Sequence, residues 1–162
     1  MKKIVLVLLC VFFMILDDTL MPFFAIRTFY PSMLLVFILC YSIVNGKWEG
    51  LFLGIFSGIL QDIYFFNGFG INAFVNMLVC ILAGILGERL FKERSFIPVI
   101  SIFFISLIKI SLVFILLFIV GQRTNPEMIF YNSIYGMFLG IFVYKRVYRL
   151  SQRPFMKREW KF

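Results

Sequence analysis

Histidine is absent from the sequence, and charged residues are scarce. Only 15% of the 162 residues are charged, whereas soluble domains carry roughly 25%. Without histidine the chain lacks the commonest general base and the commonest transition-metal ligand of proteins. It also lacks the short motifs of phosphate-binding loops, serine hydrolases, zinc peptidases and dinucleotide-binding folds. These absences predict a protein that is not an enzyme and that holds no catalytic residue, metal or cofactor.

Cysteine is rare as well. Cys10, Cys40 and Cys80 lie in three separate apolar runs. An odd number of cysteines in such positions argues against a disulfide framework. No two of them are close in sequence, which argues against a thiolate metal site. We expect all three to be small buried apolar side chains.

Hydrophobic residues, in contrast, make up 62% of the chain. A soluble domain of this size could not bury so much apolar surface, whereas a lipid bilayer solvates it. We therefore predict an all-α integral membrane protein, a single domain in which six transmembrane helices form a compact bundle. The expected helices span residues 4–24, 29–44, 50–66, 71–90, 96–120 and 128–144. The second and third are short for a hydrocarbon core of about 30 Å.

The distribution of Lys and Arg predicts the orientation of these helices. With the N-terminus in the cytoplasm, the external segments hold only Arg27 and Arg123. The cytoplasmic segments then hold Lys2, Lys3, Lys47, Arg89, Lys92, Arg94, Lys145, Arg146, Arg149, Arg153, Lys157, Arg158 and Lys161. Basic residues are retained on the cytoplasmic side of a membrane. The alternation therefore predicts that both ends of the chain are cytoplasmic.

Residues 145–162 form a predicted basic tail with seven basic residues and one acidic residue, Glu159. Such a tail attracts anionic lipid, with about 1 kcal/mol for each basic residue near the surface. It is equally suited to a cytoplasmic protein partner, or it is a simple topology anchor. Nucleic acid is not an expected partner, because the tail lies against the membrane.

Small residues recur at close-packing spacing in the third expected helix, where Gly50, Gly54 and Gly58 form overlapping G-x-x-x-G units. Gly136 and Gly140 repeat the spacing in the sixth. Small residues let helix backbones approach each other in lipid. Packing within the chain is the simpler interpretation, and a partner-binding face is the alternative.

Four polar residues flank the expected turn between the third and fourth helices: Gln61, Asp62, Asn72 and Asn76. A carboxylate inside a membrane is costly unless it is paired or hydrated. These groups either form a structural clamp between the two helices or line a ligand or proton site.

Three further charged residues lie in apolar surroundings. Lys109 falls near the middle of the fifth expected helix, where a lysine costs about 2.5–3.5 kcal/mol on insertion scales. We expect it to be buried and paired, with Asp62 as one candidate, or to face a partner or a hydrated cavity. Asp17 and Asp18 are expected at a solvated end of the first helix, with cation binding as the alternative.

The region around the third helix also carries a family resemblance. An apolar helix that begins with Pro leads into a glycine-rich helix, an Asp and, after a short turn, Gly-x-Asn-Ala. The residues that carry the pattern are Pro31, Gly46, Gly50, Gly54, Gly58, Asp62, Gly70, Asn72 and Ala73. Residues 29–90 thereby resemble the bacterial rod shape-determining protein MreD family.

The resemblance implies a non-enzymatic scaffold of the elongasome in the bacterial inner membrane. Its implied partners are an MreC-like bitopic protein and, through it, MreB, RodA and a class B penicillin-binding protein. It also implies a fold similar to the six-helix substrate-binding subunits of energy-coupling-factor transporters. The alternative function is therefore a vitamin-binding transporter subunit, which the polar cluster near the external face would also suit.

Overall fold

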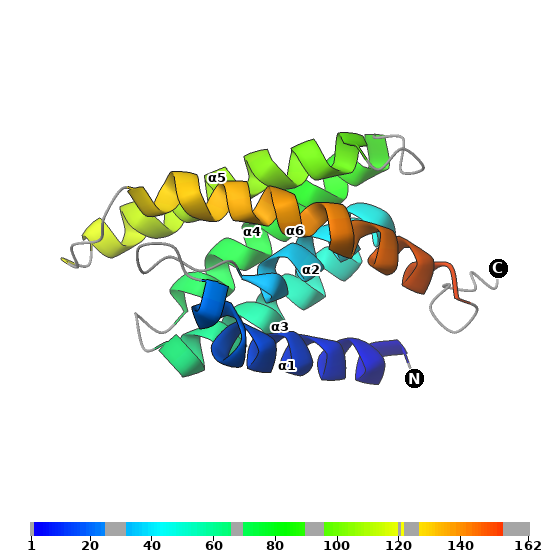
Figure 1. Ribbon diagram of the computed structural model, residues 1–162, viewed down its shortest axis with the longest axis horizontal. Coiled ribbons are helices and arrows are strands. Elements are labelled where there is room, and N and C mark those ends of the chain that lie inside the picture. The colour runs from blue at the N-terminus through cyan, green and yellow to red at the C-terminus, as the bar shows by residue number, and fades with distance from the viewer. Residues whose placement is uncertain are drawn as a thin grey trace.

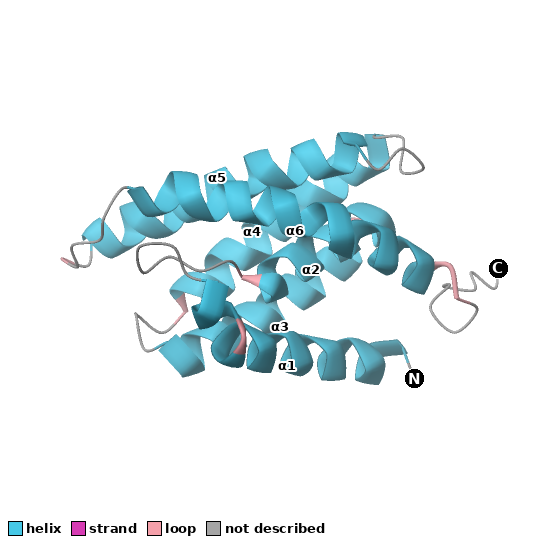
Figure 2. Cartoon of the chain, viewed as in Figure 1, coloured by secondary structure: helices cyan, strands magenta, loops and turns pink. Residues whose placement is uncertain are grey.

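The computed structural model of the chain is shown in Figure 1 and describes residues 2–24, 32–65, 70–89, 96–119, 121 and 127–153. Regular secondary structure in these ranges is helical (Figure 2), which confirms the all-α prediction. The elements are α1 (Lys2–Thr19), the short 3-10 helix η1 (Met21–Phe24), α2 (Met33–Asn45), α3 (Lys47–Phe65), α4 (Ile71–Arg89), α5 (Phe96–Ile119) and α6 (Glu127–Ser151).

The first helix ends earlier than expected, because residues 4–24 were predicted to form a single helix. The α-helix stops at Thr19 and the chain continues as η1. Pro22 lies within η1, and proline cannot donate the backbone hydrogen bond that would continue an α-helix. The second expected helix, 29–44, is described from Met33, and its first residues, 29–31, lie outside the described part.

Two other helices are longer than the apolar runs that predicted them. Helix α3 begins at Lys47 rather than at residue 50, because a single residue, Gly46, makes the turn from α2 with φ of 95°. Helix α6 continues to Ser151 rather than to residue 144. Its last turns bury Tyr144, Val147 and Ser151, so helical periodicity persists after the hydropathy has fallen.

Helix α2 is the centre of the bundle. It packs against each of the other five α-helices, and every residue from Leu34 to Ile43 is buried. A helix that is apolar on all sides is stable where protein surrounds it completely. Its 13 residues span only about 20 Å, less than the hydrocarbon core of a membrane. The shortest helix is therefore enclosed by the longer ones.

The other helices pack around α2. Helix α1 packs against α2 and α3, whereas α5 pairs with α6 on the opposite side of the bundle (Figure 1). The start of α1 and the end of α6 lie at the same end of the molecule (Figure 1). That placement is the one expected of a bundle whose chain crosses back and forth.

In the described residues, three helical segments have the length and hydropathy needed to cross a membrane: Lys2–Phe23, Ile71–Arg89 and Ile97–Ile119. Large apolar side chains are exposed along the outer faces of α1, α5 and α6. They include Ile4, Leu8, Phe12, Ile15, Phe104, Ile108, Phe118, Phe138 and Phe142. Lipid is the solvent in which such surfaces are stable. The six α-helices thus fit a membrane bundle.

Glycines set the close approach of α3 to α4. A Cβ at Gly50 would lie 2.9 Å from the Cys80 carbonyl oxygen of α4, besides overlapping Ser42 of α2. A Cβ at Gly58 would overlap the backbone of Ala73. A Cβ at Gly54 would lie 2.7 Å from the Asn76 carbonyl oxygen. These glycines are therefore buried against the chain's own helices and are not free to contact another protein.

This packing gives a matched pair of substitutions. Gly54→Ala should lower stability by about 1–3 kcal/mol, because the added methyl group meets rigid backbone. Gly140→Ala should be neutral or stabilising, because its Cβ would meet the flexible end of Ile102 at 3.3 Å and alanine favours helix. Thermal unfolding of the purified chain in detergent compares the two, and equal midpoints would contradict the packing described.

Candidate functional site

Asp17, near the end of α1, caps the start of α2. Its Oδ1 accepts a hydrogen bond from the Met33 N–H at 2.6 Å, and its Oδ2 accepts from the Leu34 N–H at 3.1 Å. The Ser32 hydroxyl donates to the same Oδ2 at 2.8 Å. Asp17 is only 3% exposed, so the expectation of a solvated helix end was wrong for this residue.

Ser32 completes the cap. Its Oγ accepts from the Leu35 N–H at 3.2 Å, and its carbonyl oxygen accepts from the Val36 N–H at 3.3 Å. The first turn of a helix contains N–H groups without partners inside the helix. Here Asp17 and Ser32 together satisfy each backbone N–H from residue 33 to residue 36.

Asp62 performs the same task for α4. Its carboxylate accepts hydrogen bonds from the backbone N–H groups of Gly70 at 3.0 Å, Asn72 at 3.0 Å and Ala73 at 2.9 Å. The Phe74 N–H donates to the Gly70 carbonyl oxygen at 2.9 Å. A negative charge at this position also interacts favourably with the positive end of the helix dipole. Asp62 is 3% exposed.

The other members of the expected polar cluster also meet across the α3–α4 junction. The Asn76 side-chain amide donates to Gln61 Oε1 at 2.9 Å and, more weakly, to Ser57 Oγ at 3.5 Å. Asn72 takes part through its backbone N–H. The structure therefore brings together Gln61, Asp62, Asn72 and Asn76, as the sequence suggested, and uses them to join two helices.

Lys109 lies inside the bundle and is 8% exposed. The carboxylates of Asp17 and Asp62 favour its positive charge from a distance. Among the described residues, the ion pair joins Lys2 to Glu49. Lys109 therefore makes no direct ion pair within that part of the chain. At longer range, the two capping carboxylates offset part of the cost of burying its charge.

Two neutral polar atoms are buried without a partner in the described part of the chain: Asn76 Oδ1 on α4 and Ser106 Oγ on α5. Ser106 lies one helical turn before Lys109 and faces Gly136 on α6. Unsatisfied buried acceptors are uncommon in folded proteins. Together with Lys109, they leave the interior of the bundle more polar than a purely apolar core.

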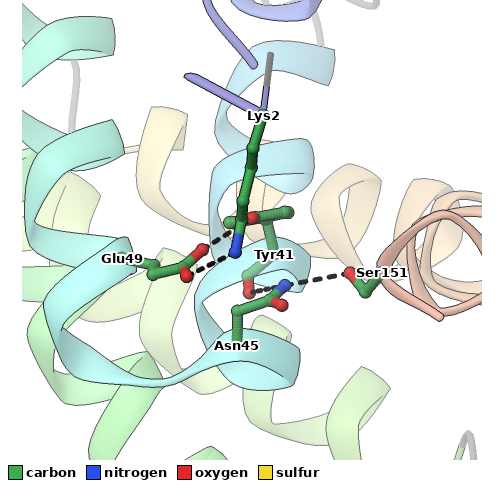
Figure 3. Close-up of polar contacts among 5 residues, drawn as sticks. All are labelled: Lys2, Tyr41, Asn45, Glu49 and Ser151. Carbon is green, nitrogen blue, oxygen red and sulfur yellow. Dashed lines mark hydrogen bonds and ion pairs between the residues drawn. The ribbon is translucent and has the colours of Figure 1, made fainter. Parts of the chain in front are cut away.

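A second polar cluster lies at the opposite end of the bundle and was not predicted from the sequence. Figure 3 shows Glu49 of α3 accepting hydrogen bonds from Lys2 of α1 and from the Tyr41 hydroxyl of α2, the latter at 2.7 Å. The Asn45 amide donates to Ser151 Oγ of α6 at 2.9 Å. At this end, helix α2 is thereby joined directly to α3 and α6, and through Glu49 of α3 to α1.

The basic tail begins as part of α6. Lys145, Arg146 and Arg149 are exposed on its last turns, and Arg153 is exposed just beyond them. Lys157 and Arg158 lie outside the described residues, as do Arg27 and Arg123 of the expected external segments. The end of α6 that carries these basic residues lies at the end of the molecule where α1 begins (Figure 1).

The described residues contain no group of three or more acidic, Cys or His side chains that could hold a metal ion. Among their buried polar side chains, Asp17 and Asp62 hold helix ends, and Gln61 and Asn76 join two helices. The fold and this site define a helical membrane protein whose interior polar residues serve its own architecture.

The family of the chain follows from its sequence along almost its whole length. A family model described as rod shape-determining protein MreD matches residues 1–153. The chain belongs to the MreD family, as residues 29–90 suggested, and this is a family of membrane proteins that is not known for catalysis. No curated protein and no solved structure shows a significant match to the chain.

The caps predict different consequences for two adjacent residues. Asp17→Ala leaves the N–H groups of Met33 and Leu34 without acceptors, at roughly 1–3 kcal/mol each. Asp18→Ala should cost only about 1 kcal/mol, since Asp18 is partly exposed and its carboxylate has a single side-chain hydrogen bond, with Tyr64. Unfolding of the purified chain gives both values, and amide exchange at Met33 and Leu34 should accelerate only in Asp17→Ala. Equal losses in the two variants would contradict the cap.

Proposed function

We propose that this chain is a membrane scaffold of the elongasome, which supports rod shape and lateral peptidoglycan synthesis. Membership of the MreD family, by a match over residues 1–153, carries the proposal and points to a role in rod shape determination. The buried polar network supports it, because Asp17, Asp62 and Gln61 are hydrogen-bonded within the chain. A rigid bundle is what a scaffold needs.

The surface that α5 and α6 offer to partners within the membrane is largely apolar. The glycine-rich face of α3 is buried against α4, whereas α5 and α6 expose Phe104, Phe118, Phe138 and Phe142. A partner that binds there must itself lie in the membrane. An MreC-like bitopic protein, with one helix in the bilayer, has the required form. Through it the chain would reach MreB, RodA and a class B penicillin-binding protein.

We also propose six membrane crossings in the bacterial inner membrane, with both ends in the cytoplasm. The common position of the start of α1 and the end of α6 supports an even number of crossings (Figure 1). The exposed basic residues of α6 gather at that same end, as retention of positive charge predicts. A fold similar to the substrate-binding subunits of energy-coupling-factor transporters belongs to the same proposal.

The alternative of a vitamin-binding transporter subunit gains no specific support from the described residues. The polar cluster that suggested it is used within the chain, since Asp62 caps α4 and Gln61 accepts from Asn76. We therefore propose the scaffold alone.

Depletion of the protein in its host should convert rods into spheres, because the elongation machinery would lose a membrane subunit. Restoring the native chain should restore rods. In the same cells, capture of the tagged chain from solubilised membranes should recover an MreC-like protein, identified by mass spectrometry. Unchanged shape after depletion would contradict the scaffold role, and recovery without any bitopic partner would contradict the proposed partnership.

The proposed orientation predicts opposite labelling of two exposed positions. Thr19 lies 18 residues along α1, about 27 Å from its start, and Gln152 follows α6. In sealed right-side-out vesicles, an impermeant maleimide should label Thr19→Cys, whereas Gln152→Cys should react only after permeabilisation. The native cysteines are buried and free, so the unmodified chain is the background control. Labelling of Gln152→Cys in sealed vesicles would contradict the orientation.

A further inference from the structure

A groove opens between α1 and α3 at the end of the bundle where the chain begins. It encloses about 380 Å³ and is lined by Lys2, Lys3, Leu6, Trp48, Glu49 and Phe52. It lies at the opposite end of α1 from the Asp17 cap. One of its lining residues, Glu49, also accepts a hydrogen bond from the Tyr41 hydroxyl of α2. Its lining combines positive charge with apolar and aromatic surface.

The charges of this groove do not cancel. Lys2 forms an ion pair with Glu49. This pair neutralises the one carboxylate among the lining residues. Lys3 has no carboxylate within ion-pair distance among the described residues, and its ammonium lies 5.7 Å from the centre of the Phe52 ring. A cation over an aromatic face keeps its charge available to an anion on its other side. The groove therefore carries one positive charge in excess.

The remaining walls are suited to the boundary between headgroups and acyl chains. Trp48, at the start of α3, is 71% exposed and Phe52 is 42% exposed. Trp side chains gather at membrane interfaces because the ring is apolar and its N–H is a donor. Leu6 and Phe52 continue the apolar wall from the lysines toward the middle of α1 and α3.

We propose that this groove is a binding site for an anionic phospholipid. The lipid phosphate lies against Lys3 and the outer side of Lys2, the Trp48 indole lies at headgroup level, and an acyl chain follows Leu6 and Phe52. Charge complementarity favours an anionic lipid over a neutral one, and the apolar wall favours a lipid over a free phosphate. Basic pockets between helices on the cytoplasmic side of membrane proteins bind such headgroups.

The test uses the full chain in detergent and a titration with phosphatidylglycerol or phosphatidylcholine, followed by native mass spectrometry. Phosphatidylglycerol should bind more tightly than phosphatidylcholine. Lys3→Gln should weaken its binding by about fivefold, the equivalent of about 1 kcal/mol for one basic residue. Lys3 is exposed and outside the Lys2–Glu49 pair, so its substitution should leave the thermal midpoint unchanged.

Arg153→Gln is the matched control, because it removes one exposed positive charge outside the groove. Its effect on phosphatidylglycerol binding should be less than about twofold, as expected for a screened surface charge. Equal losses in the two variants would overturn the proposal in favour of general surface attraction. Equal binding of the two lipids, or displacement of the lipid by inorganic phosphate alone, would also overturn it.

Discussion

The structure depends on a helix that is shorter than the membrane around it. Helix α2 has 13 residues and is enclosed by the other five α-helices. Its first N–H groups consequently start inside the protein, away from water, where unsatisfied backbone groups cost several kcal/mol. The carboxylate of Asp17 and the hydroxyl of Ser32 remove that cost. The five helices that pack on α2 therefore meet a helix whose first turn is held by this cap.

The same arrangement occurs twice along the chain. Asp17 lies near the end of α1 and caps α2, and Asp62 lies near the end of α3 and caps α4. The two carboxylates introduce negative charge into the bundle, and Lys109 from α5 provides the nearby positive charge. Charged residues that would be a liability in lipid thus fix the relative positions of several helices. In the proposed scaffold, a firmly fixed interior would define the outer shape that partners meet.

The sequence predicted some of this arrangement well and other parts poorly. Residues 71–90 and 96–120 are long apolar runs, and the structure has helices at Ile71–Arg89 and Phe96–Ile119. The meeting of Asp62 with Asn72 was also foreseeable, because a short turn separates them. The partners of Asp17 are 15 to 17 residues away, which local patterns do not reveal. The end of α6 was missed because hydropathy falls at Lys145, whereas buried Val147 and Ser151 continue the helix.

The two caps also bear on how the protein is made. Each aspartate receives its hydrogen-bond donors from the helix that follows it in the chain, so Asp17 is satisfied once α2 has been synthesised and Asp62 once α4 has. Neither carboxylate has to wait for the complete bundle. Lys109, in α5, leaves the ribosome only after both carboxylates are already in place. In synthesis from the N-terminus, the two capped helix pairs therefore come first, and the buried positive charge is added after both carboxylates.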